Sequence, residues 1–328
     1  MNDTSAKIVQ DHPIATTDIE LGKRQLDKFG YTVHESLISA DEVARTRSRL
    51  EEQAALELEQ GVASFRMANE ITLGDRELGR PAHGALPAWQ AILALPNKGR
   101  EFIDLAMNPV VAEYGRHILG GVPFFMAQST GLVVRRGSGG QVLHSDQQPI
   151  PFATPSPVYF HAMVALSDFE VGMGVTEMVP GSHHWPSPRI GRNPQTGKAE
   201  SLESFTSEPM VCKAGSAVIF ESRTWHFQGR SSSDKTRLSI LNGYCMHFMR
   251  PQDDYVASLH DDVYDNLSEA EKRMLGFEVV AEYTGRVFPR SETDSRGSVN
   301  ARYPYIPELR SGVDRRAIRF EDMHSDES

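Results

Sequence analysis

The stretch GGVPFFMAQSTGLVVRR, residues 120–136, marks the point at which the pattern of this sequence changes. Before it, most apolar residues recur at helical spacing. After it, the chain breaks into short β-rich runs that are separated by clusters of Gly, Pro and Ser. Short strands with turn signals between them are typical of an antiparallel barrel or sandwich, and not of β-α-β units. The sequence therefore predicts a mainly β fold with helical support.

The β-rich part covers residues 121–250, which we predict to be the core of the protein. The runs that have the composition of strands are 124–136, 142–146, 158–166, 175–179, 217–220 and 237–248. Residues 186–209 are polar and show no periodicity, so we expect a long loop there.

Residues 1–120 are predicted to form a helical N-terminal support region. We expect a helix at 17–29, a strand at 31–37, and a helix from Ser39 to about residue 61 that Ser39 and Glu42 open as a capping box. Residues 62–86 show no clear period, and two or three helices are expected between 89 and 119. Residues 251–328 form a C-terminal extension with one short helix near 268–275. We expect one functional domain in total.

Composition and charge limit the classes of partner. Apolar residues make up 39% and charged residues 24% of the 328 residues, which is ordinary globular usage. The net charge of −10 predicts repulsion from nucleic acid and from anionic membranes, so we expect neither as a partner. No run of about 18 apolar residues is present, and residues 1–4 show no secretory signal. The two cysteines, Cys212 and Cys245, fit a reducing compartment, and we expect a cytoplasmic protein.

One segment of the β-rich part, QVLHSDQ at residues 141–147, carries candidate metal ligands. Residues two apart on a strand point to the same face, so His144 and Asp146 present an imidazole and a carboxylate side by side. An Fe(II) centre of the two-His-one-carboxylate type needs such a pair and one more histidine from a different strand. His226, at the end of an apolar run, is the best candidate for that third ligand.

An arginine follows the proposed third ligand at a distance that suits a hairpin. Arg237 comes 11 residues after His226, at the start of the next long β-rich run. A hairpin there would return its guanidinium to the neighbourhood of the metal. Because a guanidinium can bind a carboxylate through two parallel hydrogen bonds, Arg237 is a candidate for binding the far end of a dicarboxylate cosubstrate.

These motifs, together with GVTEMVPGSH at residues 174–183, resemble the phytanoyl-CoA dioxygenase superfamily over roughly residues 124–249. The resemblance implies that residues 121–250 form a double-stranded β-helix, the jelly-roll or cupin-like barrel, as a catalytic core. It implies a dioxygenase that uses Fe(II), 2-oxoglutarate and O2 and releases succinate and CO2. It also implies that four residues bind 2-oxoglutarate, namely Gln128, Gln141, Thr176 and Arg237.

The expected substrate is a mostly apolar small molecule, and the expected reaction is hydroxylation. The sequence does not separate hydroxylation from desaturation, ring rearrangement or peroxide formation. A weaker similarity at residues 272–277, KRMLGF, is to the branch of the superfamily that tailors natural products, which implies secondary metabolism. The apolar residues expected to line the pocket are Phe65, Met67, Phe124, Met126, Phe152 and Trp185, with Arg66 or Arg189 as single polar anchors. No Lys or Arg cluster suits a CoA tail. The sequence leaves open whether the protein forms a homodimer.

Two other classes of protein fit part of this pattern. A cupin-like metal enzyme that does not use 2-oxoglutarate would need His144, Asp146 and His226 but not Arg237. A non-catalytic small-molecule-binding barrel would need none of the four residues, and the intact ligand set argues against it.

Other histidines of the chain have simpler interpretations. The tripeptide His-Ser-Asp occurs a second time at residues 324–326, in a charged tail with no strand pattern, and we do not expect that copy to bind metal. His161 lies in an apolar run and is interpreted as a core histidine. By analogy with the superfamily, His183 is interpreted as structural.

Overall fold

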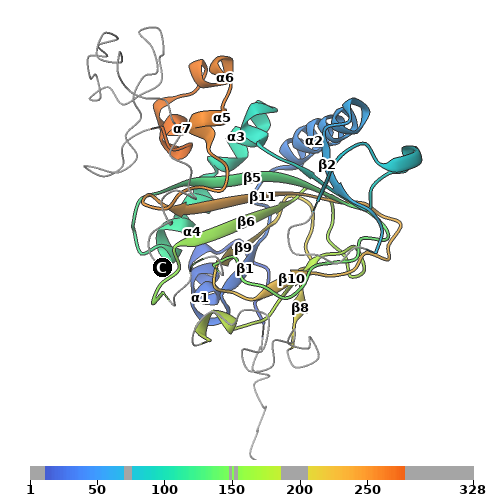
Figure 1. Cartoon of the computed structure of the whole chain (residues 1–328). Helices are drawn as coiled ribbons and strands as arrows, with labels where there is room; N and C mark the ends of the chain where they lie inside the picture. The colour runs from blue at the N-terminus through green and yellow to red at the C-terminus, as the bar shows by residue number, and fades with distance from the viewer. Residues whose placement is uncertain (1–11, 70–75, 148–149, 151–153, 186–205, 278–328) are drawn as a thin grey trace, which may run out of the picture.

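The computed structural model describes residues 12–69, 76–147, 150, 154–185 and 206–277. Within these residues the strands form two antiparallel sheets, drawn as arrows in Figure 1. The larger sheet has eight strands in the order β1-β9-β6-β11-β5-β4-β2-β3, and the smaller has three in the order β10-β7-β8. The strands are β1 (Tyr31–His34), β2 (Ala63–Arg66), β3 (Glu77–Gly79), β4 (Trp89–Ile92), β5 (Phe124–Val134), β6 (Tyr159–Ala165), β7 (Thr176–Met178), β8 (Glu208–Pro209), β9 (Ala217–Glu221), β10 (His226–Gln228) and β11 (Arg237–Met246).

Helices pack on one face of the larger sheet. They are α1 (Ile19–Phe29), α2 (Ala40–Gln60), α3 (Arg100–Ala106), α4 (Pro109–Ile118), α5 (Tyr255–Ser258), α6 (Asp261–Asp265) and α7 (Glu269–Met274). In Figure 1, α1 and α4 lie toward the β9 end of the sheet, and α2 and α3 lie toward β5. The first four helices share one hydrophobic cluster with alternate residues of the sheet, among them Leu50 of α2, Tyr114 of α4 and Phe160 of β6. The mainly β fold with helical support is therefore confirmed.

The opposite face of the larger sheet looks toward the smaller sheet. Side chains alternate along β6, so Phe160, Ala162 and Val164 face the helices, while Met163 and Ala165 join a second cluster with Met178 of β7. His161 has the same parity as Met163. Residues of β6 that point away from the helices therefore reach the space between the two sheets.

The helix signals of the sequence are confirmed. Ser39 and Glu42 form the capping box at the start of α2, and Gly61 ends this helix with φ of 71°. The short helix expected near residues 268–275 is α7, which has a capping box of Ser268 and Glu271. Among the described residues, no helix has the length and the apolar character needed to cross a membrane.

The N-terminal region contributes more β structure than the sequence predicts. Residues 89–92, expected to begin a helical stretch, are β4, which pairs with both β5 and β2. Residues 62–86, which have no periodicity, contain β2 and β3. The reason is that β2 and β4 are only four residues long, which is too short for a periodic signal, and that both bury polar side chains: Ser64 and Arg66 in β2 and Gln90 in β4.

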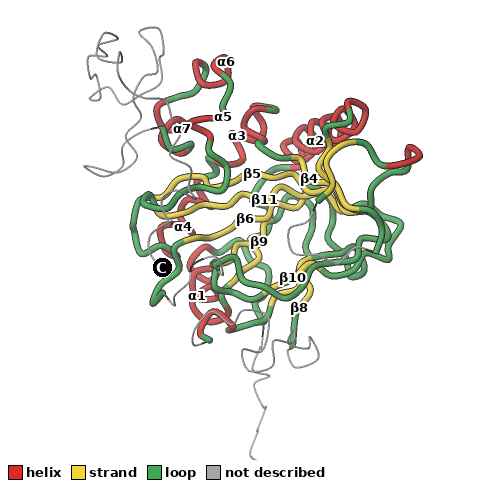
Figure 2. Tube along the Cα trace, viewed as in Figure 1, coloured by secondary structure: helices red, strands yellow, loops and turns green. Residues whose placement is uncertain are grey.

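Two expectations for the β-rich part were wrong. Residues 142–146 do not form a strand, because their ladder pairing is a single bridge between His144 and His226. The end of the expected loop at 186–209 is β8, which pairs with β7, while residues 186–205 lie outside the described part of the chain. Figure 2 shows loops running between the strands of the smaller sheet, where the chain has fewer ladder partners than in the larger one. The other five predicted strands are confirmed.

Candidate metal and cosubstrate site

Two histidines face each other at the edge of the smaller sheet. The backbone N–H of His144 donates to the carbonyl of His226 at 3.0 Å, and the N–H of His226 donates back at 2.8 Å. This exchange holds the two residues directly opposite, and their ring centroids are 4.4 Å apart. The pairing explains how the second histidine comes from a different segment, as the ligand hypothesis requires.

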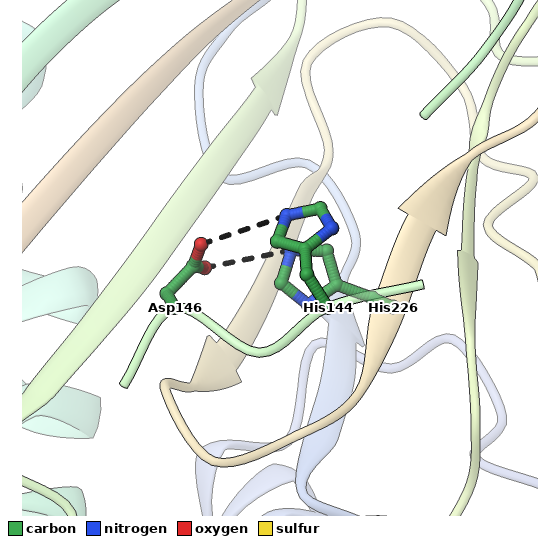
Figure 3. Close-up of side chains that lie close together, drawn as sticks. All are labelled: His144, Asp146 and His226. Atoms are coloured by element: carbon green, nitrogen blue, oxygen red, sulfur yellow. Dashed lines mark ion pairs between the residues drawn. The ribbon is translucent and has the colours of Figure 1, made fainter. Parts of the chain in front are cut away.

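The tautomers of both rings follow from their partners. The Nδ1 atom of His144 lies 2.9 Å from the carbonyl oxygen of Val142, and that of His226 lies 2.9 Å from the carbonyl oxygen of Thr224. Since a carbonyl can only accept, each Nδ1 donates, and each neutral ring keeps a lone pair on Nε2. These hydrogen bonds aim both Nε2 atoms at Asp146, as Figure 3 shows.

The three side chains fit a metal cation. The Nε2 atom of His144 is 3.8 Å from Asp146 Oδ1, and that of His226 is 3.5 Å from Asp146 Oδ2. The three candidate ligand atoms all lie within 4.8 Å of one another. Two lone pairs and a carboxylate thus converge with no proton between them, an arrangement that a cation stabilises. The donor set of two imidazoles and one carboxylate suits non-haem Fe(II).

The surroundings of His144 and Asp146 keep both residues in the charge state that metal binding needs. Burial, together with a smaller effect of the nearby His226, lowers the pKa of His144 to about 4, so the His144 imidazole is neutral at pH 7. Burial alone would raise the pKa of Asp146, but the neighbouring imidazoles of His161, His226 and His144 outweigh it and lower this pKa. Asp146 is therefore a carboxylate, and metal binding at pH 7 displaces few protons from these two residues.

The triad opens into a cavity of about 470 Å³. All seven residues that the sequence predicts for the site line this cavity: Gln128, Gln141, His144, Asp146, Thr176, His226 and Arg237. They come from β5, from the 141–146 segment, from β7, β10 and β11, so only the folded chain brings them together. The structure places these residues in one cavity; their individual roles stay predictions.

Arg237 is a buried cation without a carboxylate partner in the described residues. Its side chain is 1% exposed, and its Nε has no hydrogen-bond partner there. The remaining contacts of the guanidinium are weak: Met163 Sδ at 3.7 Å, Gln228 Oε1 at 3.5 Å and the ring of Phe169 at 5.3 Å. Burial lowers its pKa to about 10, so the group stays charged at pH 7. A charge held in this way suits an anionic ligand inside the cavity.

The cavity also contains residues that sequence reasoning missed. Gln228 lies two positions after His226 on β10 and therefore on the same face, a signal that could have found it. Its Nε2 donates to Ser138 Oγ at 2.9 Å, which leaves Oε1 toward Arg237. Gln252 and Asp253 line the cavity from the segment after β11, and no sequence pattern indicated them.

The pocket lining expected from the sequence is largely wrong. In the described part of the chain, Phe65, Met67, Phe124 and Met126 do not line the cavity. Phe124 packs against the helix-facing cluster and Met126 against α5–α7, because both point away from the smaller sheet. Trp185 lies in a separate cluster with Leu143, Val179 and Trp225. Arg66 does line the cavity, and Phe152 and Arg189 lie outside the described residues.

A comparison with models of protein families identifies the family of the chain. The family model for phytanoyl-CoA dioxygenase (PhyH) matches residues 26–239. The chain belongs to the phytanoyl-CoA dioxygenase family. The match begins in α1 and ends in β11, so it includes the triad, Arg237 and most of the N-terminal strands.

Curated relatives are similar to the chain over part of their length. Protein Rv1501 of Mycobacterium tuberculosis is 35% identical over 115 residues, which are 35% of this chain and 39% of that protein. Dioxygenase FUM3 of Gibberella moniliformis is 25% identical over 184 residues, 54% of this chain and 56% of that protein. The chain thus matches between about two fifths and three fifths of the length of these relatives.

Solved structures share the fold. The epimerase SnoN in complex with Fe3+, alpha ketoglutarate and nogalamycin RO superposes with a TM-score of 0.56 at 23% identity, covering 74% of this chain and 92% of SnoN. HygX from Streptomyces hygroscopicus, with nickel, 2-oxoglutarate and hygromycin B bound, gives a TM-score of 0.53 at 19% identity, covering 70% and 88%. The double-stranded β-helix expected from the sequence is confirmed.

Proposed function

We propose that this protein is an Fe(II)- and 2-oxoglutarate-dependent dioxygenase that hydroxylates a small molecule. One observation carries the proposal: a two-His-one-carboxylate triad lines the same cavity as the buried Arg237, which has no carboxylate partner among the described residues. The family membership and the solved structures with metal and 2-oxoglutarate bound support it.

We assign the following roles to the residues of the cavity. His144, Asp146 and His226 would hold Fe(II) and leave three positions open. When bound, Fe(II) with 2-oxoglutarate supplies the oxidation of the substrate by O2, with succinate and CO2 as the other products. Arg237 would bind the distal carboxylate of 2-oxoglutarate through its guanidinium, and Thr176, which is 4% exposed, would lie beside it. Gln141 is uncharged, and its Oε1 accepts a hydrogen bond from the backbone N–H of Gln228 at 3.3 Å.

The walls of the cavity support a substrate with both an apolar body and polar groups. Apolar surface comes from Trp89, Leu93, Leu132 and Leu241, and charged or amide groups come from Arg66, Arg76, Gln252 and Asp253. Apolar walls with a few polar anchors are the usual composition of small-molecule sites. We propose a functionalised small molecule of the natural-product type, more polar than the mostly apolar molecule expected from the sequence.

Oxygen uptake tests the proposal. Purified protein with Fe(II) should consume O2 when 2-oxoglutarate is added, and candidate small molecules should raise the rate of succinate formation. Activity with metal but without 2-oxoglutarate would favour the cupin-like alternative, in which Arg237 has no cosubstrate to bind. Absence of both metal binding and oxygen uptake would favour a binding barrel. Stimulation by acyl-CoA thioesters and not by polycyclic or glycosylated compounds would overturn the proposed substrate class.

A further inference from the structure

A third histidine lies against one of the proposed metal ligands. His161 of β6 is 1% exposed, and its ring stacks on Phe220 with centroids 4.9 Å apart. Its Nδ1 lies 3.2 Å from Asp146 Oδ2, which is closer than either of the two histidine ligands comes to that carboxylate. Sequence reasoning interpreted this residue as a core histidine, and its burial agrees; its position beside Asp146 adds a second property.

The other nitrogen of His161 has a partner that decides the tautomer. Gln128 of β5 places its Nε2 at 3.1 Å from His161 Nε2. The amide nitrogen can only donate, so His161 Nε2 accepts, and the ring proton is on Nδ1. The N–H of His161 therefore faces Asp146, whose carboxylate can only accept.

A glycine makes this connection across the sheet possible. In the register of the larger sheet, Gly243 of β11 lies between His161 of β6 and Gln128 of β5. A Cβ at Gly243 would approach Gln128 Cγ to 2.9 Å and Tyr159 Oη to 2.4 Å, so a side chain there would displace Gln128 and Tyr159. The amide of Gln128 crosses the bare backbone of Gly243 and reaches the imidazole.

The Nδ1 of His161 is buried and does not complete a hydrogen bond to any described group. The distance of 3.2 Å to Asp146 Oδ2 is short enough for a hydrogen bond, but the N–H does not point closely enough at the oxygen to form one. Buried donors are rarely left without a partner, and hydrogen bonds in an active site commonly tighten only when its ligands are bound. A small turn of the Asp146 carboxylate toward a metal would align one oxygen with His161 and leave the other, Oδ1, near His144 for the metal.

We infer that His161 is a positioning residue for the metal site: it donates from Nδ1 to Asp146 and holds this carboxylate ligand in the orientation that binds metal. The inference rests on the proposed function, because it needs His144, Asp146 and His226 to be the ligands. Groups that orient a metal ligand from outside the coordination sphere typically change metal affinity by about 10- to 100-fold when they are removed.

Three substitutions of His161 separate the two ring nitrogens. His161→Asn keeps a donor near the position of Nδ1, His161→Gln keeps an amide near Nε2, and His161→Phe keeps the ring shape alone. The measurement is the dissociation constant for Co(II), a redox-stable probe, together with its visible d–d spectrum. We expect His161→Gln and His161→Phe to bind Co(II) about 10- to 100-fold more weakly, and His161→Asn to stay within a few-fold of the unmodified protein.

Two further proteins make the outcomes distinguishable. His34→Phe is the matched control, because His34 is also a buried histidine, 5% exposed, but bonds to Tyr114 Oη at 2.9 Å away from the cavity. It should lower thermal stability and leave Co(II) affinity unchanged. Equal affinity in all three His161 variants, or loss in His161→Asn with retention in His161→Gln, would overturn the inference. Failure of the unmodified protein to bind Co(II) better than His226→Ala would instead overturn the proposed function.

Discussion

His144 and His226 are joined by two reciprocal backbone hydrogen bonds, of 3.0 and 2.8 Å, although they belong to segments far apart in the chain. This single bridge fixes the distance between the two imidazoles, and each ring is then oriented by a carbonyl of its own segment. The metal site is therefore a property of the backbone pairing as much as of the side chains.

The first prediction concerns the three ligands. Replacing His144, Asp146 or His226 by Ala removes one of three protein bonds to the metal, so iron content and activity should fall to background. Elemental analysis of the purified variants gives the iron stoichiometry. The second His-Ser-Asp copy offers a control within the chain: His324→Ala and Asp326→Ala should keep full iron. Full iron in His226→Ala would show that the ligand set is wrong.

The second prediction concerns the cosubstrate. Arg237→Ala should weaken 2-oxoglutarate binding by about 2–5 kcal/mol, because the distal carboxylate would lose a buried charged partner. Arg237→Lys should recover only part of this, since an ammonium cannot form two parallel hydrogen bonds. Calorimetric titration of 2-oxoglutarate into the metal-loaded protein measures both. The control is Arg230→Ala, because Arg230 is exposed and close in sequence, and this variant should bind 2-oxoglutarate normally. Weakened binding in Arg230→Ala with normal binding in Arg237→Ala would assign the cosubstrate carboxylate to Arg230.

The third prediction concerns the interface between helix and sheet. Leu50 of α2 is 0% exposed in the cluster that joins the helices to the larger sheet. Leu50→Ala should lower the free energy of unfolding by about 2–5 kcal/mol, through lost burial and a cavity. Leu78 is 78% exposed, and Leu78→Ala should change the same quantity by less than about 0.5 kcal/mol. Urea unfolding compares them, and similar losses in both variants would contradict this packing.

The fourth prediction concerns acid stability of the metal-free protein. Burial, together with a smaller effect of the adjacent His184, lowers the pKa of His183 to about 4, so His183 is neutral in the folded state at neutral pH. Below about pH 6.5 the imidazole of His183 is protonated in the unfolded chain but stays neutral in the folded protein. The free energy of unfolding therefore falls as the pH drops toward about 4.

His183→Gln tests this cause directly. The amide can still donate to the carbonyl of Asp27, which His183 Nε2 meets at 3.2 Å, but it does not titrate. Urea unfolding at a series of pH values between 6.5 and 4 should show a shallower loss of stability in the variant than in the unmodified protein. Parallel pH profiles of the two proteins would assign the acid sensitivity to other groups.

The sequence by itself determined the class of fold, the helix ends and the candidate ligands. These features depend on neighbours in the chain: a capping box needs Ser39 and Glu42 three residues apart. The candidate ligands His144 and Asp146 are two residues apart, although their segment forms a single bridge and not the strand that the sequence predicted. The sequence also predicted that Arg237 lies near His226, and both residues line the cavity. The hairpin expected to bring them together is wrong, because β10 belongs to the smaller sheet and β11 to the larger one, and the two strands do not pair. Local spacing carries this information without any knowledge of the fold.

Only the tertiary structure decided which residues surround the ligands. The strands β2 and β4 are too short to give a periodic signal in the sequence, and they form because β4 pairs with β5 and β2 pairs with β4. The wall residues Gln252 and Asp253 come from a segment without a motif. His161 looks like any buried residue of an apolar strand until the register places it opposite Gly243 and beside Asp146. The physical reason is that strand pairing is non-local: which side chains meet across a sheet depends on register, and register is set by the packing of the whole barrel.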